Sequence, residues 1–215
     1  MAFLAFAYDL YTLEHHSLLP PRLVERLKLK DQFQGARYET YVAAAFVRAG
    51  FNIALEDESD ISTSHCEFIA VHRATGSTYS VEAKSRHRAG LLGQAGSPKP
   101  VHEIEADISG LLSRALRKNA RNSSIVFIDV NCPPEERALL ETDWFNKLAS
   151  QLKRLEATQP ATPPFPCAFV FLTNYPYHYV GSEASVPAAG VVFTGFNMPE
   201  FKAPPTGLVA SNIPQ

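Results

Sequence analysis

The segment SIVFIDV, residues 124–130, is a continuous apolar run of strand length. Such a run is typical of a β-strand buried on both faces, because no polar residue alternates along it. Helical patterns flank the run: apolar residues recur every three or four positions in 101–120 and again in 135–157. A buried strand between two helices predicts an α/β fold in which helices cover both faces of a sheet.

The region before this strand predicts one helix followed by three strands. Residues 35–50 carry apolar side chains at helical spacing, and Gly50 is suited to end the helix. Strands are expected at 51–58, 66–72 and 78–84, the last two joined by a turn that contains Gly76. Hairpin-linked strands followed by strands that alternate with helices predict a mixed sheet.

The remaining segments extend this core at both ends. Residues 1–30 are helical in pieces with a break at Pro20-Pro21, and strands are expected at 167–173 and 190–195. We therefore expect a single domain over residues 1–215. Its parts are an N-terminal helical extension (1–30), a core (31–135), a C-terminal helix with strands (136–199) and a tail (200–215).

Composition restricts the classes of function. The net charge is −2 and the pI is about 6.4, so any nucleic-acid surface has to be local. Three widely spaced cysteines lack zinc-ligand spacing, and we expect buried free thiols. The N-terminus is a poor signal peptide and no run of eighteen apolar residues occurs, so we expect a cytoplasmic protein with no membrane partner.

The strand within YSVEAKS, residues 79–85, carries an acid and an amine on one face. Because side chains alternate along a strand, Glu82 and Lys84 project together while Val81 and Ala83 pack into the core. Glu67 lies in the preceding strand, near the far end of the hairpin, and directly paired side chains approach to about 5 Å. If the register allows, Glu67 and Glu82 can share a cation.

A third acid, Glu39, lies on the helix 35–50. Its neighbours at i+3, i+4 and i+7 are apolar, which places Glu39 at the edge of the core-facing side. Carboxylate oxygens are the ligands that Mg²⁺ takes in proteins, and Mg²⁺ keeps several waters. A lysine beside such a metal can position an attacking water or offset charge that develops on a phosphoryl group.

An acid followed fifteen residues later by Glu-x-Lys on the next strand of a hairpin resembles the PD-(D/E)XK nucleases. This resemblance implies the restriction-endonuclease-like fold, an αβββαβ core with a mixed sheet. It implies that Glu67 and Glu82, with the Ala83 carbonyl, bind Mg²⁺, for which Mn²⁺ can substitute. Lys84 would act on the nucleophilic water, and Glu39 would be an accessory ligand.

The implied activity is metal-dependent hydrolysis of phosphodiester bonds by an endonuclease, with nucleic acid, and DNA in particular, as the expected partner. Many nucleases of this fold pair to cut two strands, so a homodimer stays open, although the sequence shows no dimer signal. Basic residues near the site are candidate phosphate contacts. They are Arg86, Arg88, Arg114, Arg117, Lys118 and Arg121. The last four follow i, i+3, i+4, i+7 and predict one basic stripe, which a solvated helix face explains equally well.

Two alternatives remain at this point. The family usually has Asp as its first acid, and Glu67 is one methylene longer, which leaves open a catalytically inactive nuclease-fold module that binds nucleic acid or protein. In the other alternative, the Glu-x-Lys face is merely solvated. Asp60 is a rival first acid in a turn-like stretch. We interpret Asp129 as a structural cap, and the aromatic segment 173–179 as packing near a sheet end.

Overall fold

The computed structural model describes residues 2–56, 65–118, 120–133, 143–175, 179, 190–199 and 201. The helices are α1 (Ala2–His15), α2 (Pro21–Lys28), α3 (Phe33–Arg48), α4 (Ser109–Leu116) and α5 (Asp143–Thr158), and a 3-10 turn, η1, spans Val101–Glu103. The strands are β1 (Phe51–Leu55), β2 (Phe68–His72), β3 (Thr78–Ser85), β4 (Ser123–Asp129), β5 (Ala168–Asn174) and β6 (Gly190–Phe196).

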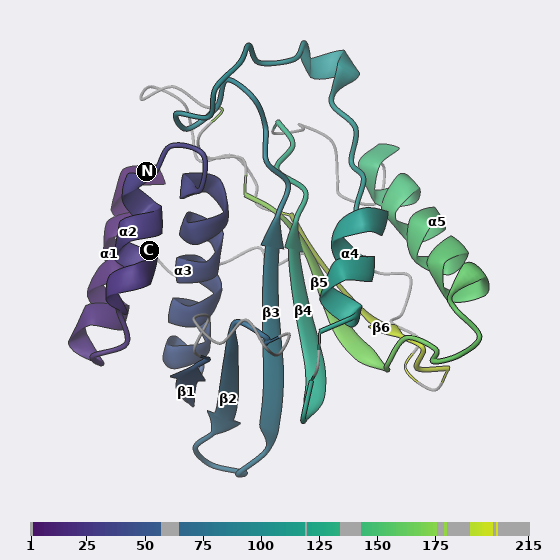
Figure 1. The fold of residues 1–215 in the computed structure, drawn as a ribbon, viewed down its shortest axis with the longest axis horizontal. Helices are drawn as coiled ribbons and strands as arrows, with labels where there is room; N and C mark the ends of the chain where they lie inside the picture. The colour runs from purple at the N-terminus through teal and green to yellow at the C-terminus, as the bar shows by residue number, and fades with distance from the viewer. Residues whose placement is uncertain are drawn as a thin grey trace.

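Within these residues six strands form one mixed sheet in the order of the sequence (Figure 1). β1, β2 and β3 are antiparallel, β3, β4 and β5 are parallel, and β6 returns antiparallel to β5. Both parallel crossovers advance in the same direction across the sheet. Because such crossovers share one hand, α4 and α5 lie on the same face, while α1, α2 and α3 lie on the other. The predicted mixed sheet with helices on both faces is confirmed.

Alternation along β4 divides the core between the two faces. Ile125 and Phe127 belong to the cluster that packs against α3, whereas Val126 and Ile128 belong to the cluster beneath α4 and α5. Both faces of this strand are thus apolar, which explains the unbroken hydrophobic run. The same parallel strand holds β3 in register, with Glu82 beside Val126.

The helix expected over 101–120 is wrong in its first half. The chain forms the η1 turn and then an irregular segment, and the α-helix begins only at Ser109. Gln151 of α5 explains this start, because its side chain accepts a hydrogen bond from the backbone amide of Ile108 and donates one to the carbonyl of Ala106. Asp107 accepts the Ser109 amide at 3.1 Å, which satisfies one donor of the first helical turn.

The N-terminal helices break at Pro20-Pro21 as expected, and Pro21 takes the first helical position of α2, where its missing N–H costs nothing. The start of the helix expected at 135–157 falls outside the described residues. Cys66 and Cys132 are buried free thiols, but Cys167, directly before β5, is exposed, contrary to expectation. None of the described helices is long and apolar enough to cross a membrane.

Candidate active site

Lys84 holds two carboxylates together at the end of β3. Its Nζ lies 2.9 Å from Oε1 of Glu67 and forms an ion pair with Oε1 of Glu82. The side chain of Glu82 is only 2% exposed, against 13% for Glu67 and 24% for Lys84. The expectation that Glu82 and Lys84 share one face and meet Glu67 is therefore confirmed as geometry.

Glu67 does not open β2 but stands at a bend directly before it. Phe68 is the residue paired with Val81, yet the amide of Glu67 also donates to the Val81 carbonyl at 3.0 Å. Two successive residues opposite one is the pattern of a β-bulge, which redirects side chains where a ladder ends. The bulge thus sets the position from which Glu67 reaches Lys84.

The same ladder end affects the Ala83 carbonyl. The Val81 carbonyl faces β2, since it accepts from Glu67. Backbone groups two residues apart on a strand face the same way, so the Ala83 carbonyl also faces the β2 side. There it lies beyond the last residue that pairs with β2. A carbonyl beside Glu82 is therefore left outside the ladder, where a cation could use it.

Glu39 reaches the site from α3 and is bound by an arginine that the sequence did not single out. Arg26 of α2 donates to both carboxylate oxygens of Glu39, each at 2.7 Å. Both groups are largely buried, with 20% and 14% of their side chains exposed. Glu67 and Lys84 are close enough to Glu39 to act on its pKa, so the four predicted residues do gather.

The electrostatics of the acids are unusual. Burial, and then the charge of Glu67, raises the pKa of Glu82 to about 7, although Lys84 opposes the shift. Burial, and then Glu67, likewise raises the pKa of Glu39 to about 7 against Arg26 and Lys84. Burial pulls the pKa of Lys84 down, but Glu67 and Glu82 outweigh it, and the pKa lies above its ordinary value. Like charges crowded below the surface favour protons or an added cation.

The donor set fits a hard cation only in part. Oε2 of Glu82 receives no hydrogen bond from the described chain although it is buried, and such an orphan acceptor is costly unless a ligand meets it. Yet no three His, Cys, Asp or Glu side chains among the described residues are placed to hold a metal ion. Two carboxylates and a carbonyl still match Mg²⁺, which binds through one or two carboxylates and keeps several waters.

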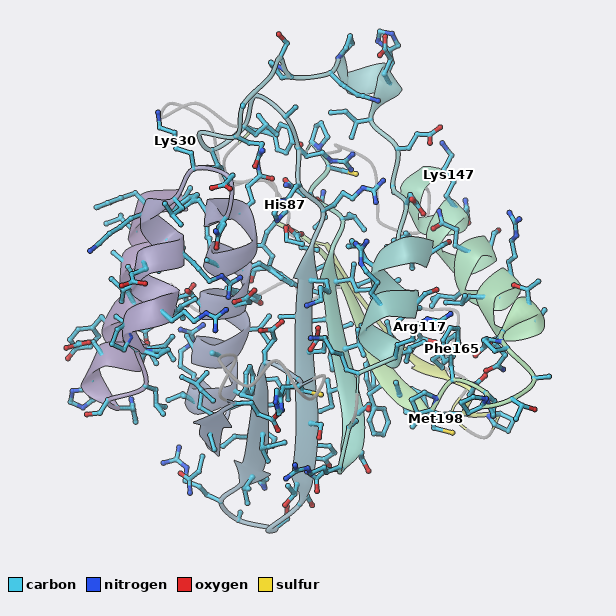
Figure 2. All side chains as sticks on the ribbon, in the orientation of Figure 1. Lys30, His87, Arg117, Lys147, Phe165 and Met198 are labelled. Carbon is cyan, nitrogen blue, oxygen red and sulfur yellow. The ribbon has the colours of Figure 1, made fainter. Side chains whose placement is uncertain are left out.

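The predicted phosphate contacts separate into two groups. Arg88 is a structural clamp, since it donates to the carbonyls of Glu105, Val130 and Asn131. Arg117 lies over the ring of Phe165, with 5.3 Å between the guanidinium carbon and the ring centroid (Figure 2). Both therefore have local partners that hold them in place.

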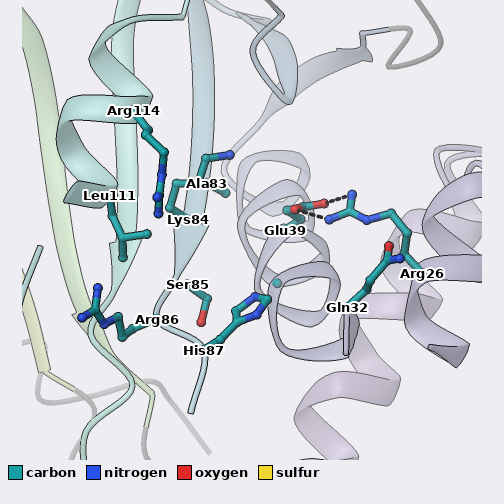
Figure 3. Close-up of a pocket in the computed structure, with 11 residues that line it drawn as sticks. Arg26, Gln32, Glu39, Ala83, Lys84, Ser85, Arg86, His87, Leu111 and Arg114 are labelled. Atoms are coloured by element: carbon teal, nitrogen blue, oxygen red, sulfur yellow. Dashed lines mark hydrogen bonds and ion pairs between the residues drawn. The ribbon is translucent and has the colours of Figure 1, made fainter. Parts of the chain in front are cut away.

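The single basic stripe does not form, because α4 ends at Leu116 and three of its four residues lie beyond the last turn. Lys118 instead approaches Glu82, with 3.9 Å between Nζ and Oε1. Arg121 is exposed beyond the helix. Arg86 and Arg114 both line a pocket beside Lys84 (Figure 3).

This pocket, of about 510 Å³, lies between the α2–α3 pair and α4. The sequence did not single out Arg26, Gln32, Gly35 and His87, which line it. Arg26 lies in the N-terminal extension (1–30), whereas the other three lie in the core and belong to no recognised motif. The amphipathic sequence PRLVERLK could have indicated Arg26, because such a helix packs its apolar face on the domain and leaves its basic side chains on the opposite side.

Two further predictions concern groups near β4 and β5. Asp129 is a buried structural acceptor, as expected: it takes the Tyr175 amide at 3.1 Å, and burial raises its pKa to about 6. Tyr175 packs on Tyr41 with ring centroids 4.2 Å apart, and Tyr179 donates to the Asn131 carbonyl, which supports the packing interpretation. Residues 176–178 and Asp60 lie outside the described residues.

Comparison of the chain with models of known protein families, with curated proteins and with solved structures finds no match.

Proposed function

We propose that this protein is a metal-dependent nuclease that hydrolyses phosphodiester bonds in nucleic acid, with DNA as the expected substrate, on a restriction-endonuclease-like core. The observation that supports it is the convergence of Glu67 and Glu82 on the ammonium of Lys84, with one oxygen of buried Glu82 left without a hydrogen bond from the described chain. A solvated strand face would not leave Glu82 2% exposed.

In this proposal Glu67, Glu82 and the Ala83 carbonyl hold Mg²⁺ or Mn²⁺, and Glu39 is an accessory ligand. Mg²⁺ bound there would supply Lewis acidity toward the phosphoryl oxygen and lower the pKa of a water. Lys84 donates a hydrogen bond to the attacking water and offsets negative charge on the phosphoryl oxygens. The water oxygen bonds to phosphorus and one ester P–O bond breaks, which leaves a phosphate monoester and a free hydroxyl.

The test is cleavage of plasmid and linear DNA by the purified protein in Mg²⁺, Mn²⁺ or EDTA. We expect divalent-dependent cleavage that falls at least about 100-fold in Glu82→Gln and in Lys84→Met, since each removes a group that acts at the reacting phosphate. The matched controls are Glu14→Gln and Lys147→Met, two exposed positions on α1 and α5. Metal-dependent cleavage that survives both site variants would contradict the proposal.

A second candidate function is a catalytically inactive module on the same core that binds nucleic acid or protein. It is favoured by the lack of a three-residue metal cluster within the described ranges. Its signature is strand binding without turnover in either metal. Stoichiometric Mn²⁺ binding that is lost in Glu82→Gln would count against it.

A further inference from the structure

Positively charged side chains are concentrated in the pocket beside Lys84, although the protein as a whole carries a net negative charge. Arg26, Lys84, Arg86 and Arg114 come from three elements and a loop and line one cavity of about 510 Å³ (Figure 3). Among the residues that line it, Glu39 is the one carboxylate, and Arg26 binds it. Arg26 pairs with Glu39, Lys84 with Glu67 and Glu82, and Arg86 with Asp107. Arg114 is therefore the cation of this lining that can attract an anionic ligand without losing a partner among the described residues.

Gly35 of α3 lines this cavity directly beside His87. A side chain there would place its Cβ 3.2 Å from Nε2 of His87, closer than ordinary contact. Glycine inside a helix costs about 1 kcal/mol relative to alanine. Gly35 lies in the regular helix and has no left-handed φ that would require glycine. The missing side chain of Gly35 therefore lets the His87 ring lie close to α3 at the wall of the cavity.

Arg114 is available for a ligand. It forms no ion pair or hydrogen bond with any part of the chain that the structure describes, and it points along the cleft toward Lys84 (Figure 3). By contrast, Arg88 and Arg117 are engaged by backbone carbonyls and by Phe165. Lys118 and Arg121 lie outside the pocket, so within it Arg114 is the cation best placed to meet a phosphate.

These features constrain how a substrate reaches the carboxylates. Glu82 is 2% exposed, and its ion-pair partner Lys84 lines the cleft between α3 and α4, so a phosphate that enters this cleft meets Lys84. A cavity of this size is in the range of small-molecule sites, with room for a nucleotide unit. Duplex-binding surfaces spread many phosphate contacts over a face, whereas single strands are drawn into basic channels.

We infer that the pocket formed around Gly35 and Arg114 seats one nucleotide unit of a single strand, so that the substrate is single-stranded or frayed nucleic acid and not continuous duplex. As a statement about cleavage, this rests on the proposed nuclease function. As a statement about binding, it can be tested without any turnover.

The experiment measures fluorescence anisotropy in EDTA with a labelled 12-nucleotide single-stranded DNA and the blunt duplex of the same sequence. We expect the single strand to bind at least about 10-fold more tightly. Arg114→Ala should weaken its binding about 5-fold and make the slope of log K against log salt less steep by about 0.7, the contribution of one phosphate on a single strand. Gly35→Leu fills the pocket without removing charge and should weaken binding at least as much.

The control is Arg154→Ala, an exposed arginine on α5, which should leave both affinity and slope unchanged. Circular dichroism and thermal melts establish whether each variant is folded. If Gly35→Leu does not fold, the result for Arg114→Ala decides. Equal affinity for duplex and single strand, or full affinity in folded Arg114→Ala, would overturn the inference. Pocket-dependent strand binding without cleavage in Mg²⁺ would instead support the inference and contradict the proposed function.

Discussion

Nζ of Lys84 lies 2.9 Å from Oε1 of Glu67, seventeen residues away in the sequence, while it also forms an ion pair with Glu82. One ammonium therefore bridges two carboxylates, Glu82 on β3 and Glu67 at the bend before β2. Lys84 is the cation nearest to both carboxylates in the metal-free protein, with Lys118 farther from Glu82 at 3.9 Å, and this arrangement leads to the first prediction.

Lys84→Met should destabilise the metal-free protein at pH 8, because two crowded carboxylates lose their shared partner. Breaking a fully buried pair costs about 3–5 kcal/mol, and partial exposure of Lys84 reduces our expectation to roughly 2 kcal/mol in the free energy of unfolding. Urea denaturation in EDTA measures it. Adding Glu82→Gln should recover much of the loss, and an unchanged midpoint in Lys84→Met would contradict the prediction.

The raised pKa of Glu82, about 7, predicts a definite pH dependence. A folded-state pKa above the unfolded value favours the protonated acid in the fold. The stabilisation is therefore complete below the unfolded pKa of about 4.5 and is lost as pH rises through 7. As pH rises from 5 to 8 in EDTA, the free energy of unfolding of Glu82→Gln should increase relative to that of wild type by roughly 1–3 kcal/mol. Parallel stability curves for the two proteins would rule this out.

Arg26 and Glu39 should be energetically coupled. Because the two groups form a bidentate pair that is mostly buried, we expect a coupling of about 1–2 kcal/mol from the double-mutant cycle Arg26→Gln, Glu39→Gln. The cycle removes contributions that Arg26 makes elsewhere. Additive single-mutant effects in urea unfolding would show that the pair contributes nothing.

Arg88 should contribute to the stability of the fold and little to nucleic-acid binding. Its guanidinium donates to the carbonyls of Glu105, Val130 and Asn131, so Arg88→Ala removes three hydrogen bonds from a charged donor at a cost of roughly 2–4 kcal/mol. The matched control is Arg86→Ala, whose exposed ion pair with Asp107 is worth under about 1 kcal/mol. Thermal melts that rank the two variants in the opposite order would refute this assignment.

The three thiols should differ in reactivity. Burial, and then the charge of Glu82, raises the pKa of Cys66 to about 12, so this thiol is inert at neutral pH. Cys132 is buried, whereas Cys167 is exposed. Iodoacetamide at pH 8 should therefore modify only Cys167 in the native protein, and intact-mass spectrometry should show a single adduct. Rapid labelling of Cys66 would mean that the site opens in solution.

Local periodicity accounts for what the sequence could predict of this site. A period of two places Glu82 and Lys84 on one face, and helical spacing places Glu39 at the core edge, so both follow from short-range geometry. The bulge at Glu67 adds one residue to a strand, which no periodicity records. The sequence therefore predicted that Glu67 and Glu82 are near each other but not how they meet.

Contacts between distant segments account for the rest. Arg26 meets Glu39 only because α2 packs beside α3, and α4 begins late because Gln151 holds the preceding backbone. Arg88 and Arg114 look alike in the sequence, yet one ties three carbonyls together and the other lines a pocket. Charge alone could not separate a structural arginine from a candidate binding one.

Gln34, buried on α3, uses all four of its hydrogen-bonding positions. Its amide nitrogen donates to the carbonyls of Arg88 and Leu91, and its oxygen accepts from the Arg88 amide and from Asn131. The first turn of α3 thus fixes the positions of Arg88 and Leu91 in the segment that follows β3. An insertion between Ser85 and Leu91 would move Arg86 and Arg88 relative to Glu67 and Glu82. An insertion after Leu91 would leave these hydrogen bonds in place.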